Sequence, residues 1–235
     1  MYGRSAVYYD NIYGLKNYRR ESEKLHTFIE RRKKAPGNTL LDVACGTGNH
    51  VTYLKRWYDV EGLDVNPAML RQARKKHPGI IFRQGDMCKF HLANRFDVIT
   101  CLFSAIGHVK TKTRMRQAVG RMARHLKRGG LLVLEPWITP DRWTVGHLSA
   151  NFVDQPDLKL ARLSVSKRRA NLSVNDEHHL VASTKGIEYF VEHLEMGLFT
   201  GEDYQNAFKD AGLGVSYDTE GLIGRGLYFG SKLAE

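Results

Sequence analysis

Three aspartates and two glycines stand where short apolar runs end. Asp42 leads into a turn that contains Gly46 and Gly48, whereas Asp64 and Asp86 follow the next two apolar runs. Glycine has no Cβ and tolerates positive φ, so this turn would let the backbone approach a ligand closely. A carboxylate accepts hydrogen bonds from two hydroxyls at once or from an amino group. The set therefore fits a ligand that has an amino-acid part, a ribose and an adenine, and that lacks phosphate.

Each carboxylate has its own expected role. We expect Asp64 to accept from both ribose hydroxyls, and Asp86 to accept from the adenine amino group beside the backbone N–H and apolar side chain of Met87. Asp42 is expected to order the glycine turn and the amino end of the ligand. The residues that phosphate-binding turns require are absent. Val51 stands where a dinucleotide-binding fingerprint needs glycine, and the chain has no Gly-Lys-Ser/Thr triplet of a nucleotide-triphosphate loop. Taken singly, each acid could instead be only a turn residue or a helix cap.

Alternating strands and helices are expected to position these residues. Residues 17–34 have the periodicity of an amphipathic helix, and the apolar runs at 39–44, 60–65, 80–84, 96–102 and 131–134 are typical of buried strands. Helical segments lie between them, including one that follows the glycine turn, one that starts at Asn66-Pro67 and one that ends at residues 128–130. This alternation predicts a parallel sheet covered on both faces, with ligands bound beyond the carboxyl ends of its strands.

The pattern changes after Trp137. Residues 138–197 lack helical periodicity and contain strand-like runs, so we expect an antiparallel insertion that lies over the sheet. A helix capped by Thr200 and Asp203 and two strands at 215–218 and 226–230 follow. The predicted division is a ligand-binding core of residues 1–137 and 198–235 with an auxiliary, substrate-holding insertion of residues 138–197.

Composition narrows the class of protein. The formal net charge of +11 favours anionic partners such as a nucleotide-linked metabolite or a nucleic acid, although it could equally serve solubility. No apolar run is long enough to span a membrane, and the first residues do not have the pattern of a secretory signal. The cysteines number three and lack disulfide or zinc spacing, so we expect a cytoplasmic protein without a metal.

The motifs resemble those of class I methyltransferases that use S-adenosyl-L-methionine (SAM) and release S-adenosyl-L-homocysteine. This likeness rests on residues 41–48, Asp64 and Gly85-Asp86-Met87. Further segments are similar to the N,N-dimethyltransferases of nucleotide-linked amino sugars, namely Met-Tyr near the start, 104–108, Glu135-Pro136-Trp137, 198–200 and 224–227. The resemblance implies a Rossmann-like sheet of about seven strands with an antiparallel insertion after the fifth, often a dimer. It also implies methylation of a 3-amino-3,6-dideoxyhexose carried on thymidine diphosphate, although His178-His179 and residues 190–195 depart from the expected pattern.

Candidate site residues follow from the turn, the strand ends and the resemblance. The expected cofactor-binding residues are Tyr18, Asp42, Ala44, Gly46, Gly48, Asp64, Val65, Asp86, Met87 and Phe103. The expected substrate-binding residues are Tyr2, Ser104, His108, Glu135, Trp137, Arg168 and Arg225. His108 is the candidate catalytic residue, because an imidazole beyond a strand end could orient or deprotonate an amine. A surface or capping histidine is the alternative for His108, and a solvated strand-face charge is the alternative for Arg168.

Three functions stay open at this stage. An N-methyltransferase for a nucleotide-linked amino sugar is preferred, and a methyltransferase for another small amine or hydroxyl, such as a glycine-type acceptor, is its near alternative. RNA methylation agrees with the positive charge, but the sequence has no Pro-Pro-Tyr type motif and no cysteine pair for attack on a base. A SAM-binding protein without activity is disfavoured by the candidate acceptor residues Ser104, His108 and Arg225.

Overall fold

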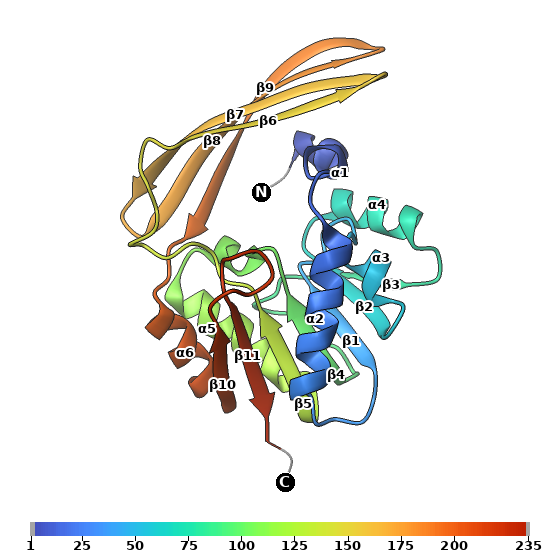
Figure 1. Cartoon of the computed structure of the whole chain (residues 1–235), viewed down its shortest axis with the longest axis vertical. Helices are drawn as coiled ribbons and strands as arrows, with labels where there is room; N and C mark the ends of the chain where they lie inside the picture. Colours follow the sequence, from blue (N-terminus) through green and yellow to red (C-terminus); the bar gives the residue numbers. More distant parts are fainter. Residues whose placement is uncertain (1–2, 234–235) are drawn as a thin grey trace.

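Two sheets organise the chain in this computed structural model, which describes residues 3–233 (Figure 1). Within those residues the larger sheet has seven strands in the order β10-β11-β5-β4-β1-β2-β3. Their bounds are β1 Thr39–Val43, β2 Asp59–Asp64, β3 Ile81–Gln84, β4 Phe96–Cys101, β5 Leu126–Leu134, β10 Leu213–Asp218 and β11 Leu227–Lys232. Neighbours from β3 to β5 pair parallel, whereas β11 is antiparallel to both β5 and β10. The order reverses between β1 and β4, which is where open α/β sheets bind ligands.

Helices cover both faces of the larger sheet and complete three layers. Helices α5 Lys112–Arg124 and α6 Gly201–Asp210 pack on one face, where Met115 and Phe208 are fully buried. Helices α2 Tyr18–Arg32, α3 Val51–Leu54 and α4 Pro67–Lys76 pack on the other, with Leu25 and Leu70 fully buried. Every residue of β4 is buried, as expected for a central strand covered on both sides. No helix described between residues 3 and 233 has the length and apolarity to span a membrane.

The expected helix starts are confirmed. The Asn66 side chain accepts hydrogen bonds from backbone N–H groups of the first turn of α4, with Pro67 at the first helical position. Thr200 and Asp203 form a reciprocal capping box at the start of α6. Side-chain acceptors satisfy N–H groups that have no partner inside the helix, so these residue types fix where each helix begins.

Two local expectations are wrong. Residues 128–130 were expected to separate a helix from a strand, but they lie inside β5, which begins at Leu126. Gly129 has a φ of 71°, and its carbonyl accepts from the N–H groups of Lys34 and Ala35, so the glycines form an irregularity within the strand. The helix after the glycine turn is also shorter than its apolar spacing indicates, because α3 ends at Leu54.

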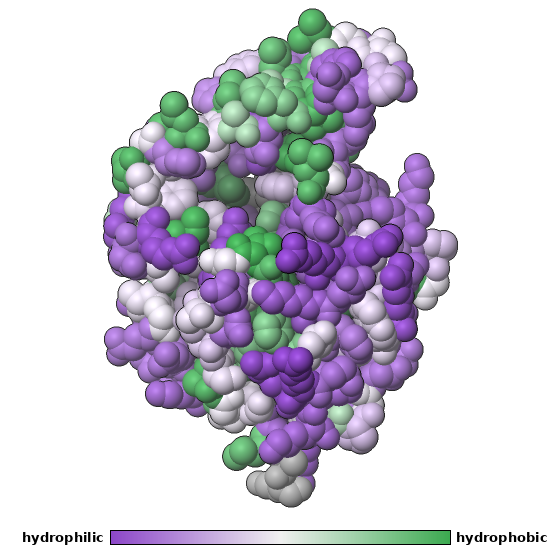
Figure 2. All heavy atoms as spheres, in the orientation of Figure 1, coloured by the Kyte–Doolittle hydropathy of each residue, from purple (hydrophilic) through white to green (hydrophobic). Residues whose placement is uncertain are grey.

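The second sheet is the antiparallel insertion. Its described strands are β6 Leu148–Gln155, β7 Leu158–Arg169, β8 Leu172–Ser183 and β9 Gly186–Gly197, paired in that order. Figure 1 shows it lying above the end of the core that carries the N-terminal segment. Figure 2 shows apolar side chains gathered on this part of the molecule, and Phe152, Leu163, Leu180 and Ile187 are among the exposed ones. The arrangement confirms the fold class, and the exact division into two units stays a prediction.

An N-terminal segment joins the two sheets and has no counterpart in the expected elements. It contains the 3-10 helix η1 Arg4–Tyr8 and the short helix α1 Tyr9–Ile12, and we call residues 3–13 the clasp. The Tyr8 hydroxyl donates to Glu188 of β9 over 2.6 Å, and the Arg4 guanidinium pairs with the same carboxylate. Two side-chain contacts thus hold the clasp against the auxiliary sheet.

Candidate active site

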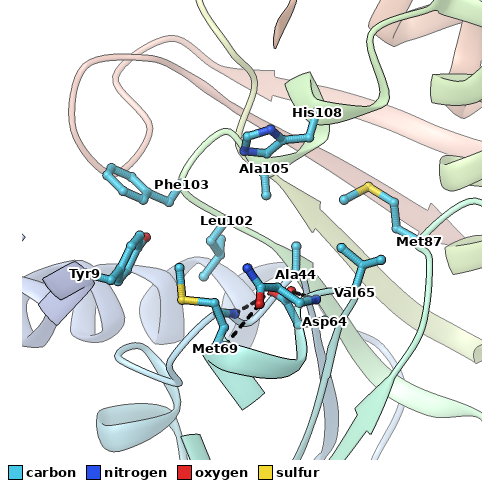
Figure 3. Close-up of a pocket in the computed structure, with 12 residues that line it drawn as sticks. Tyr9, Ala44, Asp64, Val65, Met69, Met87, Leu102, Phe103, Ala105 and His108 are labelled. Carbon is cyan, nitrogen blue, oxygen red and sulfur yellow. Dashed lines mark hydrogen bonds between the residues drawn. The ribbon is translucent and has the colours of Figure 1, made fainter. Parts of the chain in front are cut away.

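A cavity of about 580 Å³ opens at the carboxyl ends of β1, β2 and β4 (Figure 3). It is lined by Tyr9, Ala44, Gly46, Asp64, Val65, Asn66, Met69, Met87, Leu102, Phe103, Ala105 and His108. A second lobe of about 410 Å³ shares several of these residues and continues towards Asp86 and Arg114. A concave site with mostly apolar walls and a few converging polar groups suits a small-molecule ligand. The sheet therefore places one elongated site at its topological switch point.

Asp64 is the acidic group of the main lobe. Its carboxylate accepts from the N–H of Gly46 and from the N–H of Asn66, each over 2.8 Å (Figure 3). Burial raises the pKa of Asp64, and these backbone hydrogen bonds act in the opposite direction. Each carboxylate oxygen has a second lone pair, so the group can still accept from two ligand hydroxyls. The backbone contacts hold it in one orientation before a ligand arrives.

The second lobe is built around Asp86. Its carboxylate accepts from the Cys88 N–H over 2.8 Å and from the Arg114 guanidinium over 3.0 Å. Burial acts to raise the pKa of Asp86, but these two donors outweigh it and lower the pKa. The Met87 side chain lies beside both lobes. An ionised acceptor beside an apolar wall suits the amino edge and the face of an adenine.

Asp42 lies beneath the glycine turn and not on the surface of the cavity. It is fully buried, and its carboxylate accepts from the Thr100 hydroxyl over 2.8 Å. Burial raises the pKa of Asp42 to about 6. Above it, Ala44 and Gly46 have φ values of 59° and 56°, so the turn presents two left-handed residues to the cavity. Asp42 therefore ties the end of β1 to β4 next to the turn, and its expected role in ordering the turn stays a prediction.

Gly48 packs away from the cavity. Its φ is 77°, and a side chain there would come within 3.0 Å of the His77 ring. The His77 Nε2 also lies 3.0 Å from the Gly48 carbonyl oxygen. Gly48 therefore shapes the end of the turn against α4, and its predicted contact with the cofactor has no support from the lining of the cavity.

Tyr18, at the start of α2, presents a buried hydroxyl close to the turn. Its ring packs edge-on against His50 with centroids 4.9 Å apart, and the Lys16 ammonium lies 5.0 Å from the ring. Burial raises the pKa of Tyr18 to about 12, although the nearby Asn49 side chain acts in the opposite direction. The hydroxyl makes no hydrogen bond of normal geometry with any residue from 3 to 233. A buried donor left in this way fits the carboxylate or amine of an amino-acid ligand.

The chain takes an uncommon conformation directly after β4. Phe103 and Ser104 are consecutive left-handed residues, with φ values of 51° and 59°. Such strain persists where neighbours fix it, and it is frequent at functional sites. The fully buried Glu135 accepts from the Phe103 N–H over 2.6 Å, and the Ser104 hydroxyl donates to the Pro136 carbonyl over 2.7 Å. These contacts from the end of β5 hold the loop at the floor of the site.

Phe103 is also the centre of a basic and aromatic rim. Tyr13 packs edge-on against it at 5.1 Å, and the Lys16 ammonium and the Arg225 guanidinium lie 4.6 Å and 5.7 Å from its ring. Arg225 also donates to the Ser104 hydroxyl over 3.2 Å and lies 5.2 Å from the Trp137 ring. Two cations beside one aromatic wall can bind an anionic acceptor molecule.

Burial keeps His108 neutral. It lies on the 3-10 helix η2 Ala105–Val109 and lines both lobes. Burial, assisted by the nearby Lys110 charge, lowers the pKa of His108 to about 4, while the Glu177 carboxylate acts in the opposite direction. A neutral imidazole can accept or donate a hydrogen bond, but a pKa this low makes a weak general base near neutral pH. The geometry favours an orienting role.

The structure gathers most, but not all, of the expected residues. Arg168 is exposed and donates to the carbonyl oxygens of Ala170 and Pro140, so it is not brought to the cavity. Tyr2 lies outside the described residues. Tyr9 lines the cavity instead and was missed; burial raises its pKa well above the usual range. The tyrosines at positions 8, 9 and 13 are the sequence feature that could have indicated a contribution of this segment to the site.

Known proteins resemble both the sequence and this geometry. Residues 40–130 match the family model described as a methyltransferase domain. The dTDP-3-amino-3,6-dideoxy-alpha-D-glucopyranose N,N-dimethyltransferase of Streptomyces fradiae is 38% identical over 97% of this chain and 91% of its own length. The dTDP-3-amino-3,4,6-trideoxy-alpha-D-glucopyranose N,N-dimethyltransferase of Streptomyces venezuelae is 37% identical, over 92% of this chain and 91% of its own.

The chain belongs to the family of dTDP-amino-sugar N,N-dimethyltransferases. The SAM-bound structure of CalS10, an amino pentose methyltransferase from Micromonospora echinaspora, has a TM-score of 0.86 and 35% identity, and covers 99% of this chain and 98% of its own. This methyltransferase therefore uses SAM. The residues that line the main lobe fit that cofactor. No lysine or arginine occurs among the described ones. This suits a ligand that carries a positively charged sulfonium and no phosphate.

Proposed function

We propose that this methyltransferase transfers methyl groups from SAM to the 3-amino group of a sugar linked to thymidine diphosphate. Both relatives named above act on a dTDP-linked sugar with an amino group at position 3. The rim around Phe103, where Arg225 donates to Ser104 and lies beside Trp137, is the observation that supports this class of acceptor. A planar guanidinium that lies near an aromatic wall suits a diphosphate or sugar hydroxyls.

The residues of the site would act mainly by positioning. Bound SAM supplies an electrophilic methyl group on its sulfonium. Asp64 and Asp86 would hold the ribose and adenine ends, and Tyr18 the amino-acid end. Phe103 and Leu102 would keep water from the space between donor and acceptor, since both line the cavity. Alignment of this kind contributes about 7–11 kcal/mol in favourable cases.

The acceptor amine must be neutral in order to attack. Glu135 lies beneath the rim, and one of its oxygens makes no hydrogen bond with the described residues. Burial raises the pKa of Glu135, while the Phe103 N–H and the Arg225 charge act in the opposite direction. We propose that Glu135 fixes the left-handed turn, that His108 orients the amine, and that the amine releases its proton to solvent.

The test is a methyl-transfer assay with dTDP-3-amino-3,6-dideoxyglucose, glycine, a simple alkyl amine and unmodified RNA as separate acceptors. We expect SAM-dependent turnover of the dTDP sugar, with the mono- and dimethylated products separated by mass spectrometry. Turnover of glycine or RNA alone would reject the sugar assignment while retaining the methyltransferase. An Arg225→Ala variant should raise KM for the dTDP sugar by about tenfold or more, without weakening SAM binding.

We also propose that two copies of the chain associate through the outer face of the auxiliary sheet. The support is the row of exposed apolar side chains on β6–β9, which include Phe152, Leu180 and Ile187. Light scattering after size exclusion should give a dimer for the wild type and a monomer for Leu180→Asp. Leu15→Asp alters an equally apolar and fully exposed position on the core and should stay dimeric.

We place the reaction in the cytoplasm. Cys45, Cys88 and Cys101 form no disulfide and are buried or partly buried thiols, which supports a reducing compartment.

A further inference from the structure

Three metal-ligating side chains converge on the inner face of the auxiliary sheet. Glu177 of β8 and Glu192 of β9 are register partners, and His179 lies two residues beyond Glu177 on the same face. One ligand atom from each residue lies within 4.8 Å of the other two. Glu177 and His179 are buried, and Glu192 is partly buried. None of these residues lines the cofactor cavity.

His179 is the observation that points to a ligand. Its side chain is fully buried and stacks on Phe190 at 4.6 Å, with the ring planes 8° apart. Neither ring nitrogen forms a hydrogen bond with any residue from 3 to 233. A buried polar atom without a partner costs about 1–3 kcal/mol, so an imidazole with two such nitrogens needs an explanation.

The distances between the side-chain atoms of this cluster suit ligands that share one metal ion. The His179 Nε2 lies 3.8 Å from a Glu177 carboxylate oxygen, which is too long for a hydrogen bond. Ligands of one tetrahedral zinc ion are about 3.4 Å apart, since each lies about 2.1 Å from the metal. The three ligand atoms lie within 4.8 Å of one another, so a shift of at most about 1.4 Å would bring them around one cation.

Both carboxylates are already oriented from outside the cluster. Glu192 accepts from the backbone N–H groups of Gly3 and Ser5 over 2.9 Å and 3.0 Å, and also from the Ser5 hydroxyl. The other Glu177 oxygen lies 3.4 Å from the Arg162 guanidinium. Metal ligands in proteins are held by outer hydrogen bonds of this kind.

We propose that Glu177, His179 and Glu192 bind a divalent transition-metal ion of the zinc class. An imidazole with two carboxylates suits such an ion better than magnesium or calcium, which prefer oxygen ligands alone. The spacing of these residues in sequence follows no zinc motif, because two neighbouring strands bring them together. Through Glu192 the ion would connect β8 and β9 to the clasp, which carries Tyr9 into the cofactor cavity.

The test uses the full chain, stripped with a chelator and then titrated with Zn²⁺ alone. Every protein, including the reference called wild type in this test, carries His193→Asn, because exposed His193 contacts Asp176 and Glu195 and could take up zinc adventitiously. We expect about one zinc ion per chain after desalting, measured by atomic emission, with a rise in the midpoint of thermal unfolding. His179→Asn and Glu177→Gln should each weaken zinc binding by at least about tenfold and abolish that rise.

His178→Asn is the matched control, because it alters an exposed histidine on the opposite face of the same strand, and it should bind zinc normally. Equal zinc uptake by wild type and His179→Asn, or no uptake by wild type, would overturn the proposal. If the His179 and Glu177 variants do not fold, zinc-edge X-ray absorption of the wild type decides. Nitrogen and oxygen neighbours with one imidazole support the site, whereas sulfur neighbours or none refute it.

Discussion

A single carboxylate, Asp64, carries much of the cofactor site. Its two oxygens fix the glycine turn through Gly46 and the start of α4 through Asn66, and they also face the cavity. In the proposed role, the same group would link the backbone of β1, β2 and α4 to the cofactor. Its identity as a carboxylate matters more than its size, because an ionised acceptor forms stronger hydrogen bonds than a neutral one.

Asp64→Asn should weaken SAM binding by about 10–100-fold, since hydrogen bonds to a charged group contribute about 1.5–3 kcal/mol. Isothermal titration calorimetry with SAM measures the change. Asp59→Asn is the control, because Asp59 lies exposed at the opposite end of the same strand. Wild-type affinity in the Asp64 variant would remove this carboxylate from the site.

His108→Asn should leave the shape of the pH–rate profile unchanged between about pH 6 and 9. Burial keeps the pKa of His108 at about 4, so its folded form stays neutral down to that pH, where an exposed histidine would already be protonated. The acidic limb of kcat/KM should report the amine of the acceptor. A limb that disappears in the variant would instead make His108 the base.

The sequence predicted the site residues that directly follow strands. It missed those that helices and loops from other parts of the chain bring to the cavity. Asp64 and Asp86 were found because the carboxyl ends of parallel strands meet at one edge. Tyr9, Lys16 and Arg114 come from helices or loops whose docking depends on tertiary packing, so no local spacing marks them. The left-handed φ of Phe103 could not be predicted, because the sequence has no glycine at that position. Glu135 stabilises this conformation from another strand.

At the scale of elements, the clasp connects chemistry in the core to the auxiliary sheet. It contributes Tyr9 to the cavity, and its side chains are anchored on both sides: Tyr8 donates to Glu188 of β9, whereas Asp10 accepts from Thr47 of the glycine turn. Short helices such as η1 and α1 are unstable alone, so these contacts decide their position. Sequence periodicity cannot detect elements of this length, whereas it identified α2 and α5 because each buries a regular apolar stripe. Capping residues identified the starts of α4 and α6.

Glu188→Gln should raise KM for SAM by about two- to tenfold and change kcat less, because it removes the charged partner of Tyr8 and Arg4. Steady-state kinetics under saturating acceptor measure both constants. Asp154→Asn, which removes an exposed ion pair with Lys159 in the same sheet, serves as the control. Equal constants for the Glu188 variant and the wild type would show that the contacts of Tyr8 and Arg4 with Glu188 do not shape the cavity.

At the scale of the molecule, the central strands accept a buried carboxylate at a cost to global stability. The pKa of Asp42 rises from 3.8 to about 6 because burial disfavours its charged form. Above pH 6 the carboxylate is ionised in both folded and unfolded chains, so the full penalty is present. As the pH falls from 6 to 3.8 the folded state binds the proton first, and the penalty disappears.

Asp42→Asn should therefore stabilise the fold near pH 8 by an amount of the order of 3 kcal/mol at most, since one pKa unit corresponds to about 1.36 kcal/mol. The gain should vanish near pH 4. Urea unfolding of wild type and variant at both pH values measures the difference, and the asparagine can still accept from Thr100. A variant that is less stable at pH 8 would contradict the assigned cost of burial.

The two ends of the described chain lie far apart, and this affects how the enzyme can be handled. Gly3 donates to Glu192 beside the auxiliary sheet, whereas β11 runs to the opposite end of the core (Figure 1). A fusion partner or affinity tag attached before Gly3 would lie against the auxiliary sheet and the clasp. Immobilisation through the carboxyl terminus would keep the support away from that sheet (Figure 1), and is the orientation to choose for a reactor or a sensor surface.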